Sequence, residues 1–241
     1  MPKIAKFFLA LAFAMAAGHA AQAQTFDLVT GDIPPYSIKS GDRPGFIREF
    51  VAEMAKVLKV SVNASFHPMG EAIEKARTGE NTLVFPLART AQREPNFTWV
   101  VKLFDMEACF LTVPGKPAVA GPEDAKGRRI GALKGSAFTA YLADKGFTGV
   151  VEGANSAELA GKLVAGEIDV WFADLTEATA TWRAAGHAGA PVKGHRAFTG
   201  ALWLGASLKA PAIDVAAWED AFQVLQQDGT FDRIYQSYGL K

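Results

Sequence analysis

The feature that most constrains the fold is a repeated alternation of apolar strands and amphipathic helices. Three strand-like segments, 26–30, 60–66 and 82–87, are separated by helix-like segments over 46–58 and 69–77. Apolar residues in the first helix follow the helical period, which predicts a helix that packs one face on a sheet. Strand, helix, strand, helix, strand predicts a parallel sheet with right-handed crossovers.

The same alternation starts again after a rigid polar segment, Pro114-Gly115-Lys116-Pro117. A further strand over 106–113 precedes this segment. Beyond it the sequence predicts strands over 129–133, 149–152, 168–173 and 197–207, and helices over 136–144, 156–165 and 175–184. Two final helices, over 213–227 and 230–238, have no strand after them and must pack on a sheet that already exists. The sequence therefore predicts two similar α/β units, with the first boundary near Pro114.

The N-terminal segment has the three-part pattern of a secretory signal peptide. Lys3 and Lys6 precede an apolar run over 7–17 that is too short to span a bilayer, and Ala21-Gln22-Ala23 forms an A-x-A cleavage site. We predict cleavage after Ala23 and an exported protein. Cleavage removes two lysines and no acid, and so leaves 23 basic against 25 acidic residues. This near-neutral balance argues against nucleic acid as a partner.

Cysteine and histidine usage points to no metal or cofactor. The single cysteine, Cys109, lies in an apolar run, which predicts a core thiol and excludes an intramolecular disulfide. The sequence has no H-E-x-x-H, C-x-x-C, G-x-S-x-G or P-loop motif. His67, His187 and His195 do not have the spacing of metal ligands.

Two arginines follow the third strand, in the segment Phe85-Pro86-Leu87-Ala88-Arg89-Thr90-Ala91-Gln92-Arg93-Glu94. Open α/β sheets bind ligands at the carboxyl ends of their strands. Thr90 is placed to cap a helical turn, where a cation opposes the helix dipole. The arginines either fork hydrogen bonds onto a carboxylate or pair on the surface with Glu94 or Asp105. This segment alone leaves both interpretations open.

Polar residues at other strand ends complete the pattern. In the segment 31–36, Pro34 and Pro35 predict an extended loop. Ser136, within Lys134-Gly135-Ser136, can cap a helix or offer its hydroxyl to an anion. Asp174 begins Asp174-Leu175-Thr176-Glu177, which resembles a capping box. Asp174 is either a plain N-cap or an anion that faces a ligand ammonium, and one carboxylate can do both.

Taken together, these segments resemble the periplasmic solute-binding proteins of ABC importers, specifically the polar amino acid type (extracellular solute-binding protein family 3). The resemblance covers the whole mature chain and rests on the order and spacing of several short motifs. These are Pro34-Pro35-Tyr36, Gly45-Phe46, Arg89 to Glu94 with Phe97-Thr98-Trp99, Gly127-Arg128-Arg129-Ile130-Gly131 with Gly135-Ser136, Gly166-Glu167-Ile168-Asp169 before Asp174, and Asp228-Gly229-Thr230-Phe231 with Ile234 and Tyr238.

The resemblance implies a type II, Venus-flytrap fold of two lobes, each a mostly parallel sheet flanked by helices. Lobe 1 would comprise 24–111 and 200–241, and lobe 2 would comprise 112–199, with hinge strands at 108–113 and 196–200. It also implies a monomeric periplasmic protein that binds an amino acid or a related small carboxylate between its lobes. Such a protein delivers its ligand to an ABC permease in the inner membrane.

The resemblance assigns roles to particular residues. Arg93 would grip the ligand carboxylate and Asp174 its α-ammonium, with Gly135 and Ser136 as further contacts to the carboxylate. Tyr36 and Phe46 would form apolar walls, and Arg89 either reaches the ligand or braces the loop. Asp32 and Phe85, at the ends of their strands, complete the candidate set.

The sequence also departs from the pattern of amino acid binders. Pro86 and Ala88 stand where these proteins often have hydroxyl or small polar residues, and Ala137 follows Ser136. The ligand is therefore open between an amino acid and another carboxylate. Three tryptophans, Trp99, Trp171 and Trp203, either stack on the ligand or fill the core.

Two other functions fit a chain of this kind. An exported enzyme of the cyclohexadienyl dehydratase type, which resembles this family, needs a positioned acid in the cleft, for which Asp32, Glu71 and Asp174 are the candidates. A sensor component, read by a membrane receptor instead of a permease, is the other alternative. No residue here has a sequence context that marks it as catalytic, so a non-enzymatic binding protein is the main prediction.

Overall fold

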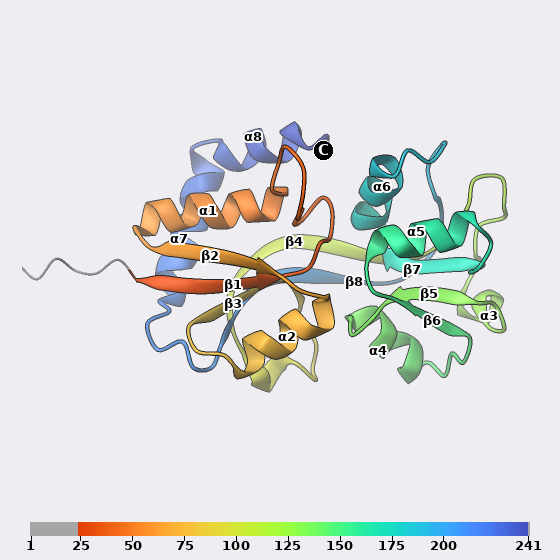
Figure 1. The fold of residues 1–241 in the computed structure, drawn as a ribbon, viewed down its shortest axis with the longest axis horizontal. Coiled ribbons are helices and arrows are strands. Elements are labelled where there is room, and N and C mark those ends of the chain that lie inside the picture. The colour runs from red at the N-terminus through yellow and green to blue at the C-terminus, as the bar shows by residue number, and fades with distance from the viewer. Residues whose placement is uncertain (1–23, 241) are drawn as a thin grey trace, which may run out of the picture.

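The computed structural model of the chain describes residues 24–240. The predicted signal peptide and its cleavage after Ala23 lie outside the described residues. Two groups of helices and strands are joined by a pair of long strands that run from one group to the other (Figure 1). We call the group that contains the start of the described chain the first lobe, and the other the second lobe.

A single mixed sheet of eight strands runs through both lobes in the order β2-β1-β3-β8-β4-β7-β5-β6. In each lobe three strands are parallel, as predicted: β1 pairs with β2 and β3, and β5 pairs with β6 and β7. The strands are β1 (Thr25–Thr30), β2 (Ser61–Phe66), β3 (Thr82–Ala88), β4 (Phe97–Thr112), β5 (Ile130–Leu133), β6 (Val150–Gly153), β7 (Val170–Asp174) and β8 (Val192–Ser207).

The two crossing strands are longer than the sequence predicted. β4 and β8 pair antiparallel from Phe97 opposite Ser207 to Thr112 opposite Val192, and each has 16 residues. Only their apolar halves, 106–113 and 197–207, were recognisable as strands, because the remaining halves mix charged and apolar residues. The predicted hinges lie in this ladder, whose register shifts between Ala108 and Cys109. The predicted lobe boundaries also fall within these two strands.

Helices of the first lobe include the last two of the chain, which return to it as expected. The inner face of α1 carries Phe46 and Phe50, both fully buried, and burying a side chain of this size stabilises the fold by roughly 1.5–3 kcal/mol. The ring of Phe231 stacks on Phe50 with centroids 4.7 Å apart. The helices of this lobe are α1 (Phe46–Leu58), α2 (Met69–Thr78), α7 (Val215–Gln227) and α8 (Thr230–Ser237).

The second lobe is built around stacked aromatic rings, with Phe110 and Phe172 4.5 Å apart. Cys109, next to this stack, is fully buried as the sequence predicted. The helices of this lobe are α3 (Pro122–Ala125), α4 (Ala137–Asp144), α5 (Ser156–Val164) and α6 (Leu175–Ala184). The sequence did not predict α3, which has only four residues.

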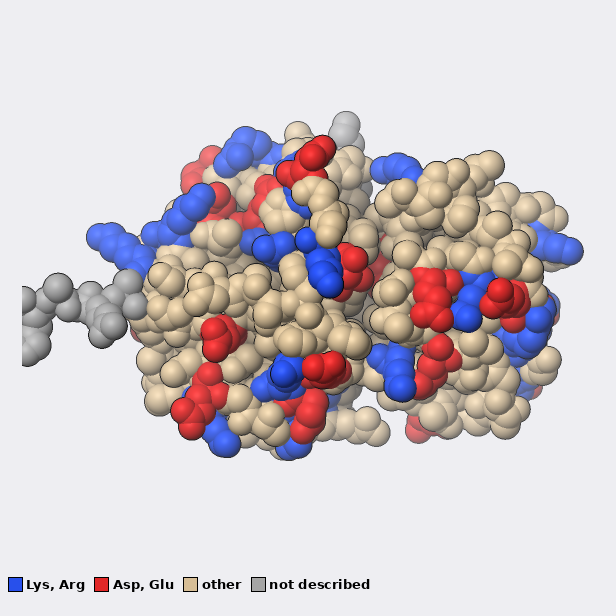
Figure 2. All heavy atoms as spheres, viewed as in Figure 1, with Lys and Arg blue, Asp and Glu red and all other residues tan. Residues whose placement is uncertain are grey.

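The surface charges and the helix lengths say little more about the function. On the face drawn in Figure 2, acidic and basic side chains are interspersed over both lobes. None of the helices within 24–240 combines the length and the apolar character needed to cross a bilayer. Over the same residues, no group of three or more His, Cys, Asp or Glu side chains could hold a metal ion.

Candidate functional site

A small pocket of about 40 Å³ lies between the two lobes. Beside it, a wider cleft shares Arg93 and Ser136 with the pocket. The pocket walls are mainly apolar, with Ile33, Met69, Ile73, Pro86, Ala88, Met106, Leu133, Ala137, Phe138 and Leu202 among them. Its polar lining comprises Tyr36, Arg93, Ser136, Asp174 and Glu177.

Arg93 reaches this pocket from a tight turn that follows β3. The carbonyl oxygen of Thr90 accepts hydrogen bonds from the backbone N–H groups of Arg93 (3.0 Å) and Glu94 (2.9 Å). The prediction that the Thr90 side chain caps a helix is wrong, because only a three-residue 3-10 helix, Glu94–Asn96, forms here and its N-cap is Arg93. A helix this short has no appreciable dipole to oppose the cations.

The guanidinium of Arg93 bridges the lobes and has no acidic partner among the described residues. Its Nη1 donates to the carbonyl of Ala88 (3.1 Å) and its Nη2 to the carbonyl of Gly135 in the second lobe (3.3 Å). Burial lowers the pKa of Arg93 to about 10. A cation held at the pocket by neutral carbonyls is well suited to receive an anion.

Arg89 has a different environment from that of Arg93. It forms a two-point ion pair with Glu94, with Nε–Oε2 at 2.8 Å and Nη2–Oε1 at 2.5 Å. Its guanidinium carbon lies 5.1 Å from the ring centroid of Trp99 and 4.8 Å from that of Trp203. Arg89 borders the wider cleft but not the pocket, so these contacts favour its role as a brace of the loop.

Asp174 lies at the end of β7 and is 2% exposed. Its Oδ2 accepts hydrogen bonds from the Tyr36 hydroxyl of the first lobe and from the Glu177 backbone N–H (3.0 Å), so the side chain caps α6 as predicted. Its Oδ1 accepts from the Glu107 backbone N–H on β4 (3.0 Å). Burial raises the pKa of Asp174, and these donors act against that effect.

Tyr36 is held by the start of α1. Its carbonyl oxygen accepts from the Ile47 N–H (3.2 Å), and its ring packs edge-on against Phe46, with centroids 5.3 Å apart. The segment 31–36 is not the extended loop that the two prolines predicted. The backbone of Ile33 pairs with Ser37 across a closed turn, which directs the Tyr36 hydroxyl to Asp174. Burial, with the adjacent charge of Asp174, raises the pKa of Tyr36 well above its ordinary value.

Gly135 and Ser136 meet the first lobe at the start of α4. The hydroxyl of Ser136 accepts from the backbone N–H groups of Phe138 (3.1 Å) and Thr139 (3.5 Å), so it caps the helix. Gly135 has a φ of +69°, and a Cβ atom on it would lie 2.8 Å from the Cα of Gly70 on α2. The two lobes therefore touch backbone to backbone at these two glycines.

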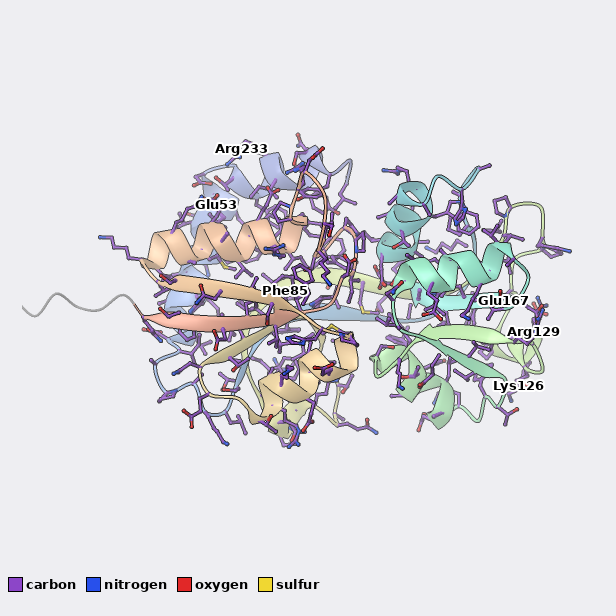
Figure 3. All side chains as sticks on the ribbon, in the orientation of Figure 1. Glu53, Phe85, Lys126, Arg129, Glu167 and Arg233 are labelled. Carbon is purple, nitrogen blue, oxygen red and sulfur yellow. The ribbon has the colours of Figure 1, made fainter. Side chains whose placement is uncertain are left out.

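Three of the nine candidate residues line neither the pocket nor the wider cleft. Phe46 is fully buried, because the rings of Tyr36, Phe50, Phe104, Tyr235 and Tyr238 surround it. Phe85 is also fully buried within the first lobe (Figure 3). Asp32 is exposed, and its carboxylate accepts from the Lys39 backbone N–H. The structure thus brings together Arg93, Asp174, Ser136, Gly135 and Tyr36.

Glu177 is a polar pocket residue that sequence reasoning missed. The capping-box pattern predicts that its side chain folds back on the N-cap, but the Ser156 hydroxyl on α5 donates to it instead. Glu177 is 4% exposed, and burial, with the charge of Asp174, raises its pKa to about 8. The available signal was its spacing, because residues three apart share one face of a helix and so Glu177 lies beside Asp174.

The chain has a relative in sequence among well-described proteins. It is 27% identical over 219 residues to the lysine/arginine/ornithine-binding periplasmic protein of Escherichia coli (strain K12), and the match covers 85% of this chain and 83% of that protein. No protein-family model matches the chain.

Solved structures share the fold over nearly the whole chain. An ancestral arginine-binding protein bound to arginine superposes with a TM-score of 0.77 at 23% identity and covers 89% of this chain and 97% of its own. A substrate-binding protein of an ABC uptake transporter from Streptococcus pneumoniae, with bound histidine, gives 0.80 at 18% identity over 89% and 92%. A histidine kinase sensor domain gives 0.81 at 18% identity over 90% and 96%. The chain thus has the fold of the two-lobe periplasmic solute-binding proteins, and its sequence is similar to that of a periplasmic protein named for binding lysine, arginine and ornithine.

Proposed function

We propose that the protein is a periplasmic solute-binding component of an ABC transporter, which holds an amino acid or a related small carboxylate in the interlobe pocket. The observation that carries this proposal is the Arg93 guanidinium, which lines the pocket without a counter-ion among the described residues. A planar guanidinium can fork two hydrogen bonds onto one carboxylate, and a half-enclosed pocket strengthens that pairing relative to water.

The pocket and the relative support the same ligand class. The pocket opens beside the wider cleft of about 760 Å³, which is large enough for a small molecule, and the walls of both come from both lobes. A ligand that contacts both lobes favours the closed state, because only a difference in affinity between two states shifts their equilibrium. The relative in Escherichia coli is named as a binding protein for lysine, arginine and ornithine. Export, cleavage after Ala23, the lobe boundaries and delivery to an inner-membrane permease belong to this proposal.

A thermal-shift screen tests the proposal. Its ligands are the twenty proteinogenic amino acids, their desamino carboxylates, and small amines that lack a carboxylate. A ligand present at 100 times its Kd stabilises the folded protein by about 2.7 kcal/mol, so a bound carboxylate should raise the melting temperature measurably. The proposal fails if no carboxylate shifts the transition, or if amines without a carboxylate shift it as much.

One observation favours an enzyme as the second candidate. Of the three acids expected to serve such an enzyme, Asp32 and Glu71 lie outside the pocket and Asp174 lines it. Glu177, which was not among them, also lines the pocket, and its pKa of about 8 keeps it protonated at neutral pH. Prephenate and arogenate therefore belong in the same screen. Formation of an aromatic product that Glu177→Gln abolishes would establish the enzyme, and unchanged substrate would leave only binding.

A further inference from the structure

We propose that Glu177 is the carboxyl group that receives the ammonium of the ligand, so that the site selects small solutes carrying both a carboxylate and an ammonium. This inference rests on the proposed function and deepens it. The family resemblance implies that Asp174 binds the ligand ammonium. We assign this role instead to Glu177, which lies in the first turn of α6.

Asp174 has little capacity left for a ligand. An ionised carboxylate offers about four lone-pair positions. Backbone N–H groups of Glu107 and Glu177 and the Tyr36 hydroxyl occupy three of them, and the backbone N–H of Thr176 also acts on this carboxylate. An ammonium could bind Asp174 fully only by displacing the Tyr36 hydroxyl, whose ring is fixed against Phe46 and Phe104.

Glu177 is in the opposite situation. Among the described residues, its side chain has one hydrogen-bond partner, the Ser156 hydroxyl, which donates to Oε1. No lysine, arginine or histidine of the described chain pairs with it, although it is almost fully buried and lines the pocket. A buried carboxyl without a cation is costly to ionise, and a ligand ammonium would supply the missing charge.

The positions of Arg93 and Glu177 determine where a ligand would carry its charges. Arg93 lies on the first lobe and Glu177 on the second, and both line the same pocket. A molecule with an anion at one end and a cation at the other would therefore contact both lobes and stabilise the closed state. Its body would rest on apolar walls such as Met106 and Leu202. The titratable groups that line the pocket are Tyr36, Arg93, Asp174 and Glu177.

Matched ligands and matched variants test this assignment. The probes are the proteinogenic amino acid with the largest effect in the screen and its desamino carboxylate, titrated calorimetrically into the wild type, Glu177→Gln and Asp174→Asn. We expect the wild type to prefer the amino acid, and Glu177→Gln to weaken amino acid binding by about 30-fold or more, as when a buried charge loses its partner. Binding of the desamino carboxylate by Glu177→Gln should be unchanged.

A second readout separates ligand contact from a purely structural role. Because the pKa of Glu177 is about 8, binding of an ammonium at pH 7 should release a proton from it. Titrations in two buffers of different ionisation enthalpy measure that release, which should disappear in Glu177→Gln. A wild type that prefers the desamino carboxylate, or a Glu177→Gln variant that binds the amino acid normally, would overturn the inference and leave the proposed function intact. If neither probe class binds at all, the proposed function itself fails.

Discussion

At the scale of single residues, a partly buried arginine and a buried carboxyl, neither with an oppositely charged partner among the described residues, distinguish the pocket from the rest of the molecule. Elsewhere, acidic side chains pair with nearby bases on exposed surfaces, as Glu74 does with Arg77 and Asp169 with Arg129. In the pocket, burial alone lowers the pKa of Arg93 and is the main cause of the raised pKa of Glu177. Charges held in this way cluster at functional sites, which is the physical reason to place the ligand here.

The raised pKa of Glu177 predicts how stability depends on pH. In the unfolded chain this carboxyl ionises near its ordinary value of 4.5, whereas in the folded protein it ionises only near 8. Between these values the folded state binds more protons, so the stability that Glu177 contributes is complete below pH 4.5 and is lost as the pH rises through 8. Each pH unit within this window costs about 1.4 kcal/mol at most.

Melting temperatures of the ligand-free protein between pH 5 and 9 measure this effect. We expect Glu177→Gln, whose side chain does not titrate, to lose less stability than the wild type over that range. Glu80→Gln, a substitution of an exposed residue, serves as the control and should follow the wild type. Identical profiles for the wild type and Glu177→Gln would show that Glu177 ionises normally in the folded protein.

The sequence could predict some of these residues and not others. Arg93 was predictable, because an arginine after a buried strand in an α/β sheet lies where ligands bind. Glu177 was not, since a capping-box pattern explains it equally well and only the packing of α5 against α6 turns its side chain toward Ser156. Phe46 was misplaced for a similar reason: the aromatic residues that cover it come from segments far apart in the chain.

At the scale of elements, the site is assembled from the end of β3 and the starts of α4 and α6. The strand and helix pattern predicted these elements well, because apolar periodicity is a local property of the sequence. The full length of β4 and β8 was not predictable, since the charged half of each strand is stabilised by pairing with the apolar half of the other, as at Lys102 opposite Trp203. The lobes meet where Gly135, before α4, touches Gly70 on α2.

The contact of Gly135 with Gly70 predicts a variant that impairs closure. A Cβ atom at Gly135 would clash with the Cα of Gly70 at 2.8 Å, so Gly135→Ala should weaken ligand binding. The matched control is Gly166→Ala, because Gly166 has nearly the same φ (+71°) but no neighbour within 4 Å. Both variants should lose about 1–2 kcal/mol of folding stability, because an alanine is strained at the positive φ that both glycines adopt. Calorimetric titration should find weaker binding only for Gly135→Ala, and equal affinities for the two would contradict a closed state with this contact.

At the scale of the whole molecule, polar contacts beside the pocket link the two lobes. The Arg93 side chain of the first lobe donates to Gly135 of the second, and the Tyr36 hydroxyl of the first donates to Asp174 of the second. Arg93, Tyr36 and Asp174 line the pocket, and the paired strands β4 and β8 run from one lobe to the other (Figure 1). A ligand carboxylate at Arg93 would add a further link between the lobes and shift the equilibrium toward closure.

The most direct test of this account is a calorimetric comparison of an amino acid with its amide, in which the carboxylate charge is absent. The amino acid is the one with the largest effect in the thermal-shift screen, and the proteins are the wild type, Arg93→Ala and Arg89→Ala. We predict that the wild type binds the acid far more tightly than the amide. Arg93→Ala should lose roughly 2–5 kcal/mol of binding free energy for the acid and most of its preference for it, whereas Arg89→Ala should keep both. Equal binding of acid and amide by the wild type, or undiminished binding of the acid by Arg93→Ala, would contradict it.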